Sequence, residues 1–201
     1  MPALTRLLLF GLFAALSACG QFGGSTDIAA ETVPVDMAYR ISPEAEARFS
    51  HGLRAMDAQN WPVALTAMDA LWNEYPWLSG PPLNAALVHQ HQGHSEEAET
   101  WFRRALQSNA GNIDARNAYA VFLRELGRFD EAEQQYLSAL EIAGDDATTH
   151  FNLGILYDLY LGQKAQALEH YIRYQQIGDA DRQVQGWVAD LQRQLAARED
   201  A

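Results

Sequence analysis

The chain has 201 residues with 26 acidic and 14 basic side chains, so its formal net charge is −12 at neutral pH. A chain this acidic does not attract nucleic acid or anionic lipid by electrostatics, and no nucleic-acid partner is expected. It contains a single cysteine, which excludes an internal disulfide and leaves apolar burial to stabilise the fold. The length suits one domain.

Residues 1–18 predict a secretory signal peptide. Arg6 precedes an apolar stretch at residues 7–16, and two small residues, Ser17 and Ala18, follow it. This order of basic, apolar and small residues is typical of a cleaved leader. The apolar stretch is about half as long as the roughly 20 residues that a membrane-spanning helix needs, so a transmembrane anchor is the weaker interpretation.

Cys19, directly after these residues, is the expected site of lipid attachment. The sequence Leu16-Ser17-Ala18-Cys19 resembles the lipobox of bacterial lipoproteins, in which the cysteine receives a diacylglyceryl group and its new amino group is acylated. Two or more acyl chains hold a protein stably on a bilayer. In that family a residue other than Asp after the cysteine, here Gly20, favours the outer membrane. The resemblance implies a lipid-anchored outer-membrane protein that faces the periplasm; the alternative is an ordinary secretory signal with an incidental cysteine.

Residues 19–41 predict a flexible tether. They are rich in Gly, Ser, Thr, Ala and Val, Pro34 interrupts them, and they show no helical period. About 20 such residues give a mean reach of roughly 25 Å. The next residues, Ser42-Pro43-Glu44, predict the start of a helix, because they supply an N-cap, a proline at the first helical position and an acid in the first turn.

Small and large side chains then recur at intervals of 34 residues. One column is small throughout: Gly52, Ala86, Ala120 and Gly154. Three further columns follow the same interval: Ala64, Ala98 and Ala132; Met68, Phe102 and Tyr136; Leu71, Ala105 and Ala139. Their fourth members, Ala167, Tyr171 and Tyr174, come one residue late. The sequence therefore predicts one inserted residue after Gly154, most simply near the turn at residues 160–162.

This pattern resembles the tetratricopeptide repeat, a helix–turn–helix unit of 34 residues. Its small residues lie where two antiparallel helices approach closely, and its aromatic residue fills the space between successive pairs. The turn between the helices requires a residue that tolerates a positive φ. Gly93, Gly127 and Gly162 stand there in three repeats, and Gln59 stands there in the first.

The resemblance implies an all-α solenoid of four tetratricopeptide repeats within residues 42–180. The expected repeats are residues 45–78, 79–112, 113–146 and 147–180. Residues 181–201 are expected to form a capping helix, since Val184, Trp187, Val188, Leu191 and Leu195 recur at helical spacing. Such a helix would cover the open end of the array.

Catalytic motifs are not found in the sequence, so we expect neither an enzyme nor a cofactor. His89, His91 and His94 have side chains that bind zinc or copper in other proteins. A helix would point His89 and His91 about 200° apart, however, which favours ordinary surface and turn histidines and no metal site. An aromatic group at Trp72–Trp77 offers a second candidate ligand surface, for which helix packing is the favoured interpretation.

In tetratricopeptide-repeat proteins the first helices of successive repeats line a concave groove. Carried over by position, this implies eight partner-binding residues: Asn84, Leu87, Asn117, Val121, Arg124, Phe151, Asn152 and Ile155. A subset of the family holds a C-terminal carboxylate with lysines and arginines, but those positions here hold Phe, Leu, Asn and Phe, so that clamp is not expected. The mostly apolar groove suits an extended peptide or an amphipathic helix. Occupation by the chain's own tether or capping helix is the alternative.

Short tetratricopeptide-repeat lipoproteins that resemble this chain often serve as pilotins or assembly factors. We therefore expect a membrane-anchored scaffold that binds a protein partner for a cell-envelope machine, such as a pilus, secretion or polymer-export assembly, with the bilayer contacted through Cys19. One alternative is a lipoprotein that binds a metal or small ligand through His89, His91 and His94 or through the Trp72–Trp77 patch. Another is an accessory domain of a larger enzyme complex.

Overall fold

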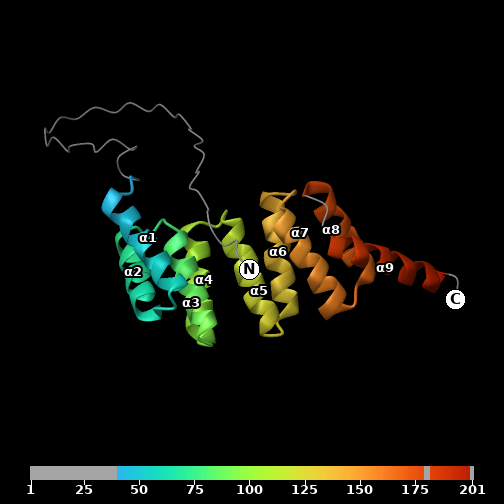
Figure 1. Ribbon diagram of the computed structural model, residues 1–201, viewed down its shortest axis with the longest axis horizontal. Helices are drawn as coiled ribbons and strands as arrows, with labels where there is room; N and C mark the ends of the chain where they lie inside the picture. The colour runs from blue at the N-terminus through green and yellow to red at the C-terminus, as the bar shows by residue number, and fades with distance from the viewer. Residues whose placement is uncertain (1–39, 179–181, 200–201) are drawn as a thin grey trace, which may run out of the picture. The chain divides into compact units, whose positions relative to one another are not determined.

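The computed structural model describes residues 40–178 and 182–199 (Figure 1). The predicted signal peptide, Cys19 and the predicted tether up to residue 39 lie outside this range. All regular elements in the described ranges are helical, and no helix there is both long and apolar enough to cross a bilayer.

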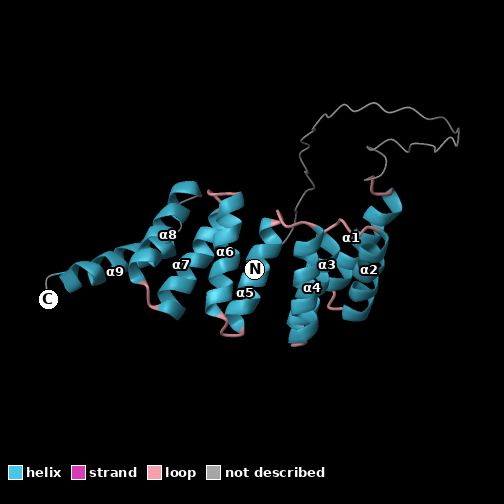
Figure 2. Ribbon diagram, turned by 180° about the vertical axis from the view of Figure 1, so that it is seen from behind, coloured by secondary structure: helices cyan, strands magenta, loops and turns pink. Residues whose placement is uncertain are grey.

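The helices form four antiparallel pairs followed by a single helix. The first two pairs are α1 (Pro43–Asp57) with α2 (Trp61–Glu74) and α3 (Gly80–His91) with α4 (Ser95–Ser108). The next two are α5 (Ile113–Glu125) with α6 (Phe129–Ile142) and α7 (Ala147–Ile155), continued by the π-helix η1 (Leu156–Leu161), with α8 (Lys164–Ile177). The last helix is α9 (Arg182–Glu199). Successive pairs stack side by side in both views (Figures 1 and 2), which confirms the predicted all-α solenoid.

Side-chain caps begin three of the four first helices. The Ser42 hydroxyl accepts a hydrogen bond from the Ala45 amide at 3.1 Å, and Pro43 follows in the first turn as predicted. Asn112 and Asp146 cap α5 and α7 in the same way. Each cap satisfies an amide that the helix itself leaves unpaired, so the start of each first helix is fixed by local sequence.

The turn within each pair has the predicted left-handed residue. Gly93, Gly127 and Gly162 have φ values of 77°, 75° and 65°. Gln59 occupies the same place in the first pair with a φ of 56°. A side chain with a Cβ is disfavoured there, so the first turn carries a strain that the other three avoid.

Small residues fill the contacts between paired helices. The buried positions of these columns are Gly52, Ala86, Ala120, Gly154, Ala64, Ala98, Ala132 and Ala167. The large side chains that alternate with them, Met68, Phe102, Tyr136 and Tyr171, are fully buried in one continuous core. The 34-residue columns therefore describe real packing positions.

The extra residue of the fourth pair is taken up by the π-helix, not by the turn. Over Leu156–Leu161 the backbone winds more widely, and the Gln163 amide bonds back to the Tyr157 carbonyl at 2.8 Å. A π-turn accommodates one additional residue without breaking the helix. The π-helix begins four residues before the predicted place at residues 160–162 and runs into it. The wider turn leaves Leu159 and Tyr160 70% and 45% exposed.

Helix α9 packs on α8 at the end of the array. Val184 and Leu191 on α9 are buried, and the Trp187 ring lies 5.4 Å from the ring of Tyr171 on α8. These contacts cover apolar surface that a further repeat would otherwise cover, which is the role predicted for a capping helix.

Candidate functional site

One apolar side chain of each first helix occupies the same position in its pair. These residues are Leu53, Leu87, Val121 and Ile155, on α1, α3, α5 and α7. Each is half-buried and packs against the core with part of its surface. We call the surface that carries this row, together with its polar neighbours on the same helices, the first-helix face. Of the predicted site residues, the fold brings Leu87, Val121 and Ile155 together along it.

Polar side chains flank the apolar row. Asn84 and Asn152, half-buried, lie three residues before Leu87 and Ile155 on the same helices. Asn84 donates to the Gly80 carbonyl at 2.8 Å, which leaves its side-chain oxygen as the acceptor for a ligand. On the other side, Gln90 donates to Glu125 at 2.7 Å and so links α3 to α5. The face therefore presents amide groups on either side of an apolar strip.

Asn117 does not share this surface. Its side chain is only 5% exposed, and its amide donates to the Thr149 hydroxyl at 2.7 Å. The same amide lies 3.3 Å from an Asp146 carboxylate oxygen, so it connects α5 to the start of α7. Carry-over by position alone assigned Asn117 to a ligand, whereas its hydrogen bonds give it a role in fixing two first helices relative to each other.

Arg124 is the basic residue of the predicted site. Its guanidinium carbon lies 5.4 Å from the centroid of the Tyr160 ring. Its Nε and Nη1 are shielded from solvent and have no hydrogen-bond partner within the described residues. Tyr160 reaches this place because η1 carries the extra residue, and sequence analysis missed it because the π-helix was not foreseen.

Phe151 is engaged by the end of the array. Its ring lies 5.2 Å from the ring of Tyr174 and stacks at 6.1 Å on Trp187 of α9. The capping helix therefore covers part of the first-helix face at the fourth pair. Because Phe151 already contributes to this packing, part of its ring is not available to a partner.

The three clustered histidines do not converge on one point. The rings of His89 and His94 lie 5.9 Å apart, while His91 packs edge-on against Trp61 at 4.7 Å. Burial lowers the pKa of His89, which disfavours its charged form. Across residues 40–178 and 182–199, no group of three or more metal-binding side chains is placed to hold an ion.

The Trp72–Trp77 group is divided between two packing contacts. Trp72 meets Trp101 edge-on at 5.6 Å, and the Arg104 guanidinium lies over both rings. Tyr75, which is buried, contacts Trp77 at 5.5 Å. The aromatic rings are thus used between helices and do not form one exposed surface, as the packing interpretation predicted.

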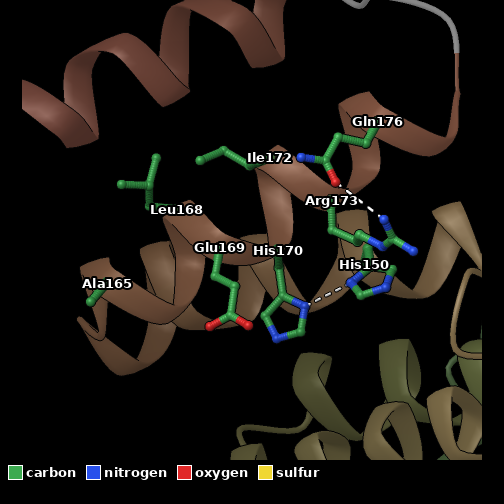
Figure 3. Close-up of a pocket in the computed structure, with 8 residues that line it drawn as sticks. All are labelled: His150, Ala165, Leu168, Glu169, His170, Ile172, Arg173 and Gln176. Atoms are coloured by element: carbon green, nitrogen blue, oxygen red, sulfur yellow. Dashed lines mark hydrogen bonds between the residues drawn. The ribbon is translucent and has the colours of Figure 1, made fainter.

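A second polar cluster, which sequence analysis missed, lies between α7 and α8. His150 and His170 join through their Nδ1 atoms at 2.8 Å, beside a pocket of about 540 Å³ (Figure 3). His150 Nε2 also lies 3.0 Å from the Gly144 carbonyl, which accepts only, so we assign the ring hydrogen of His150 to Nε2. The neutral His150 Nδ1 then accepts from His170. Burial, with the neighbouring His150, lowers the pKa of His170.

Models of the tetratricopeptide repeat match residues 112–178 and 83–104. The chain carries tetratricopeptide repeats. No curated protein matches the sequence significantly. Among solved structures, pilF of Pseudomonas aeruginosa is 24% identical, with 76% of this chain and 69% of that one covered at a TM-score of 0.67.

Two further structures share the fold. MamA is 13% identical over 78% of this chain and 85% of its own, with a TM-score of 0.64. YrrB is 20% identical over 70% and 71%, with a TM-score of 0.56, and is described as a tetratricopeptide-repeat protein with an unusual peptide-binding site. At these identities the similarities establish the fold of the repeat array. Tetratricopeptide-repeat proteins mediate protein–protein interactions, and the repeat array supports this general function for the chain.

Proposed function

We propose that the protein is an interaction scaffold that holds a partner polypeptide against the first-helix face. The observation that carries the proposal is the row of half-buried apolar side chains at Leu87, Val121 and Ile155, one on each of three successive first helices. Their remaining exposed surface is apolar, and a partner that covers it gains the free energy of removing that surface from water. Amide groups beside the row would bond the partner's backbone.

An extended peptide or an amphipathic helix fits this arrangement. Either ligand presents apolar side chains at regular intervals, and either carries backbone or side-chain polar groups beside them. The similarity in fold to YrrB, which is described as having a peptide-binding site, supports the same class of ligand. The alternative of a metal ligand has less support, because His91 packs edge-on against Trp61 and no group of three metal-binding side chains among the described residues is placed to hold an ion.

We further propose that the scaffold works at the outer membrane, anchored through lipid on Cys19 and facing the periplasm. This rests on the lipobox-like sequence before Cys19 and on the tether that follows it. A tethered array that binds polypeptides suits an assembly factor of a cell-envelope machine, such as a pilus, secretion or polymer-export system. The similarity in fold to pilF of Pseudomonas aeruginosa is consistent with this setting.

The proposal is tested by placing a charge in the apolar row. Val121→Lys puts an ammonium group where the partner's apolar side chain would lie, so the variant should lose capture of the partner that the wild type retains. Gln134→Lys adds the same charge at an exposed position of α6 and is the matched control. Circular dichroism should show that both variants keep the wild-type helix content. Equal capture by both folded variants would contradict the proposal.

A further inference from the structure

Two buried hydrogen-bond donors without partners lie on adjacent helices, α5 and α6. The first is the Arg124 guanidinium, whose Nε and Nη1 are shielded from solvent. The second is the hydroxyl of Tyr136, a side chain that is fully buried. None of these three atoms has a hydrogen-bond partner within the described residues. Leaving a buried donor unpaired is unfavourable, and more so for a charged group.

Three other arginines of the array show the carboxylate partner that Arg124 lacks among the described residues. Arg48 pairs with Glu74 at 2.6 Å, and Arg128 pairs with Glu99 at 2.8 Å. Arg173 pairs with Asp145. Among the residues that the structure describes, Arg124 has the face of the Tyr160 ring, at 5.4 Å, where these arginines have a carboxylate. An aromatic ring attracts a cation but accepts no directed hydrogen bond comparable to that of a carboxylate.

The two groups belong to helices that pack against each other as one antiparallel pair, and the charge of Arg124 acts on the Tyr136 hydroxyl. Burial raises the pKa of Tyr136, and the positive charge of Arg124 opposes that rise. The Tyr160 ring lies over the guanidinium and 5.2 Å from the Phe129 ring, and Tyr160 is 45% exposed, so the ring can turn toward solvent at the loss of one ring contact. The next residue on η1, Leu159, is 70% exposed and offers an apolar contact beside the same place.

We propose that Arg124 and Tyr136 form a carboxylate-binding subsite, opened when the Tyr160 ring moves aside. The guanidinium would donate two parallel hydrogen bonds, and the phenol a third, to one carboxylate of the bound polypeptide. A single negative charge matches one guanidinium and one neutral donor. The neighbouring Glu125 carboxylate, which accepts from Gln90 at 2.7 Å, repels every anion at this place in proportion to the anion's charge and so favours a singly charged group. This inference rests on the proposed function, because it defines the chemistry of the partner that the first-helix face binds.

The subsite is tested on the full chain in detergent by observing the Arg124 Nε–H resonance with labelled arginine. Phenylacetate, which joins a carboxylate to an apolar ring, should shift this resonance, whereas the neutral phenylacetamide should not. Tyr136→Phe should weaken phenylacetate binding by about tenfold, the loss expected for one hydrogen bond to a charged group. The variant should fold, because Phe102 occupies the equivalent position in the second pair. Arg124→Gln should abolish the binding.

If the Tyr136 hydroxyl only stabilised the fold, its removal would lower the melting temperature of the free protein. Because the Tyr136 hydroxyl has no partner in the free protein, Tyr136→Phe should leave the melting temperature without ligand unchanged or higher. Two peptides identify the source of the carboxylate: one ends in a free carboxylate after Phe, and the other carries an internal Asp beside Phe with an amidated end. Tighter binding of either one supports the subsite and identifies its source.

Three results would overturn the subsite: equal shifts with phenylacetate and phenylacetamide, unchanged affinity in Tyr136→Phe, or binding of neither peptide. Failure of the subsite and failure of the proposed function are distinguishable. If Val121→Lys loses the partner while phenylacetate does not bind, only the subsite is wrong. If phenylacetate binds at Arg124 while Val121→Lys still captures the partner, the proposed docking along the first-helix face is wrong.

Discussion

The Tyr171 ring lies where a side chain at Gly154 would have to be. A Cβ placed on Gly154 would lie 2.5 Å from the Tyr171 Cδ1 atom, which is closer than carbon atoms pack. Gly154 is on α7 and Tyr171 on α8, so the missing side chain is what lets the last pair close. Gly52 is the equivalent residue of the first pair. Its Cβ would meet the flexible end of Met68 at 2.7 Å, and the Ala67 Cβ only at 3.1 Å, so a small shift relieves the contact.

This difference predicts effects of different size for the same substitution. Gly154→Ala should destabilise the array by about 1–3 kcal/mol, because the aromatic ring cannot move aside without disturbing the core. Gly52→Ala should change stability by less than about 1 kcal/mol, because the Met68 side chain can turn away and alanine favours the helix. Urea denaturation of both variants measures the difference. Equal losses would mean that the two contacts are equally rigid.

The strained turn of the first pair predicts a stabilising substitution. Gln59→Gly should raise the free energy of unfolding by about 1 kcal/mol, because glycine adopts a φ of 56° without steric cost. Gly93→Ala is the control in the second pair. It should lower stability through the backbone alone, because φ there is 77° while the added Cβ would meet no neighbouring atom. Thermal melting of both variants tests whether the first substitution raises stability and the second lowers it. A lower melting temperature for Gln59→Gly would show that its side chain, not its backbone, stabilises the turn.

Much of the fold could be predicted because backbone geometry demands particular residue types. A close helix contact requires Gly or Ala, as at Gly154 and Ala132, and a left-handed turn favours Gly, as at Gly127. These requirements repeat every 34 residues and are visible in one sequence. The place of the inserted residue was not predictable in the same way, because a turn and a π-helix both accommodate one extra residue.

The side-chain contacts of the candidate site were less predictable. Asn117 was assigned to a ligand by its place in the repeat, yet its amide bonds to Thr149, on the helix of the following pair. The stacking of Phe151 on Trp187 depends on the angle at which α9 crosses the last pair. His150 and His170 meet across two helices. Helical spacing specifies which face a residue occupies but not which residue of another helix it will meet.

The His150–His170 pair predicts a dependence of stability on pH. The pKa of His170 is lowered in the folded protein, below the value of about 6.5 expected for the unfolded chain. The unfolded state therefore binds more protons as the pH falls below about 6.5, and stability should fall with it until the folded pKa is passed. His170→Gln keeps a donor for His150 but does not titrate, so it should lose less stability between about pH 7.5 and 5.5.

Urea denaturation at the two pH values measures this effect. The exposed His51 supplies the control, and His51→Gln should retain the wild-type dependence. The same dependence in the wild type and in His170→Gln would show that other groups cause the acid sensitivity.

Lipid attachment at Cys19 predicts that the wild-type protein and a Cys19 variant differ in lipid labelling. Cells supplied with labelled palmitate should label the wild-type protein and not the Cys19→Ala variant, because Cys19 is the sole cysteine and would carry the lipid-bearing terminus after cleavage. The variant should also leave the membrane fraction. Equal labelling of the two proteins would exclude Cys19 as the attachment residue.

Photo-crosslinking in intact cells tests the central claim, that a polypeptide binds along the first-helix face, most directly. A photoreactive amino acid at Val121 lies in the apolar row of α5, and the same group at the exposed Gln134 lies on α6, outside the row. We expect a discrete protein adduct from Val121 and none from Gln134, with the Val121 adduct reduced when Leu87 is replaced by lysine. An adduct from Gln134 with none from Val121 would contradict the account.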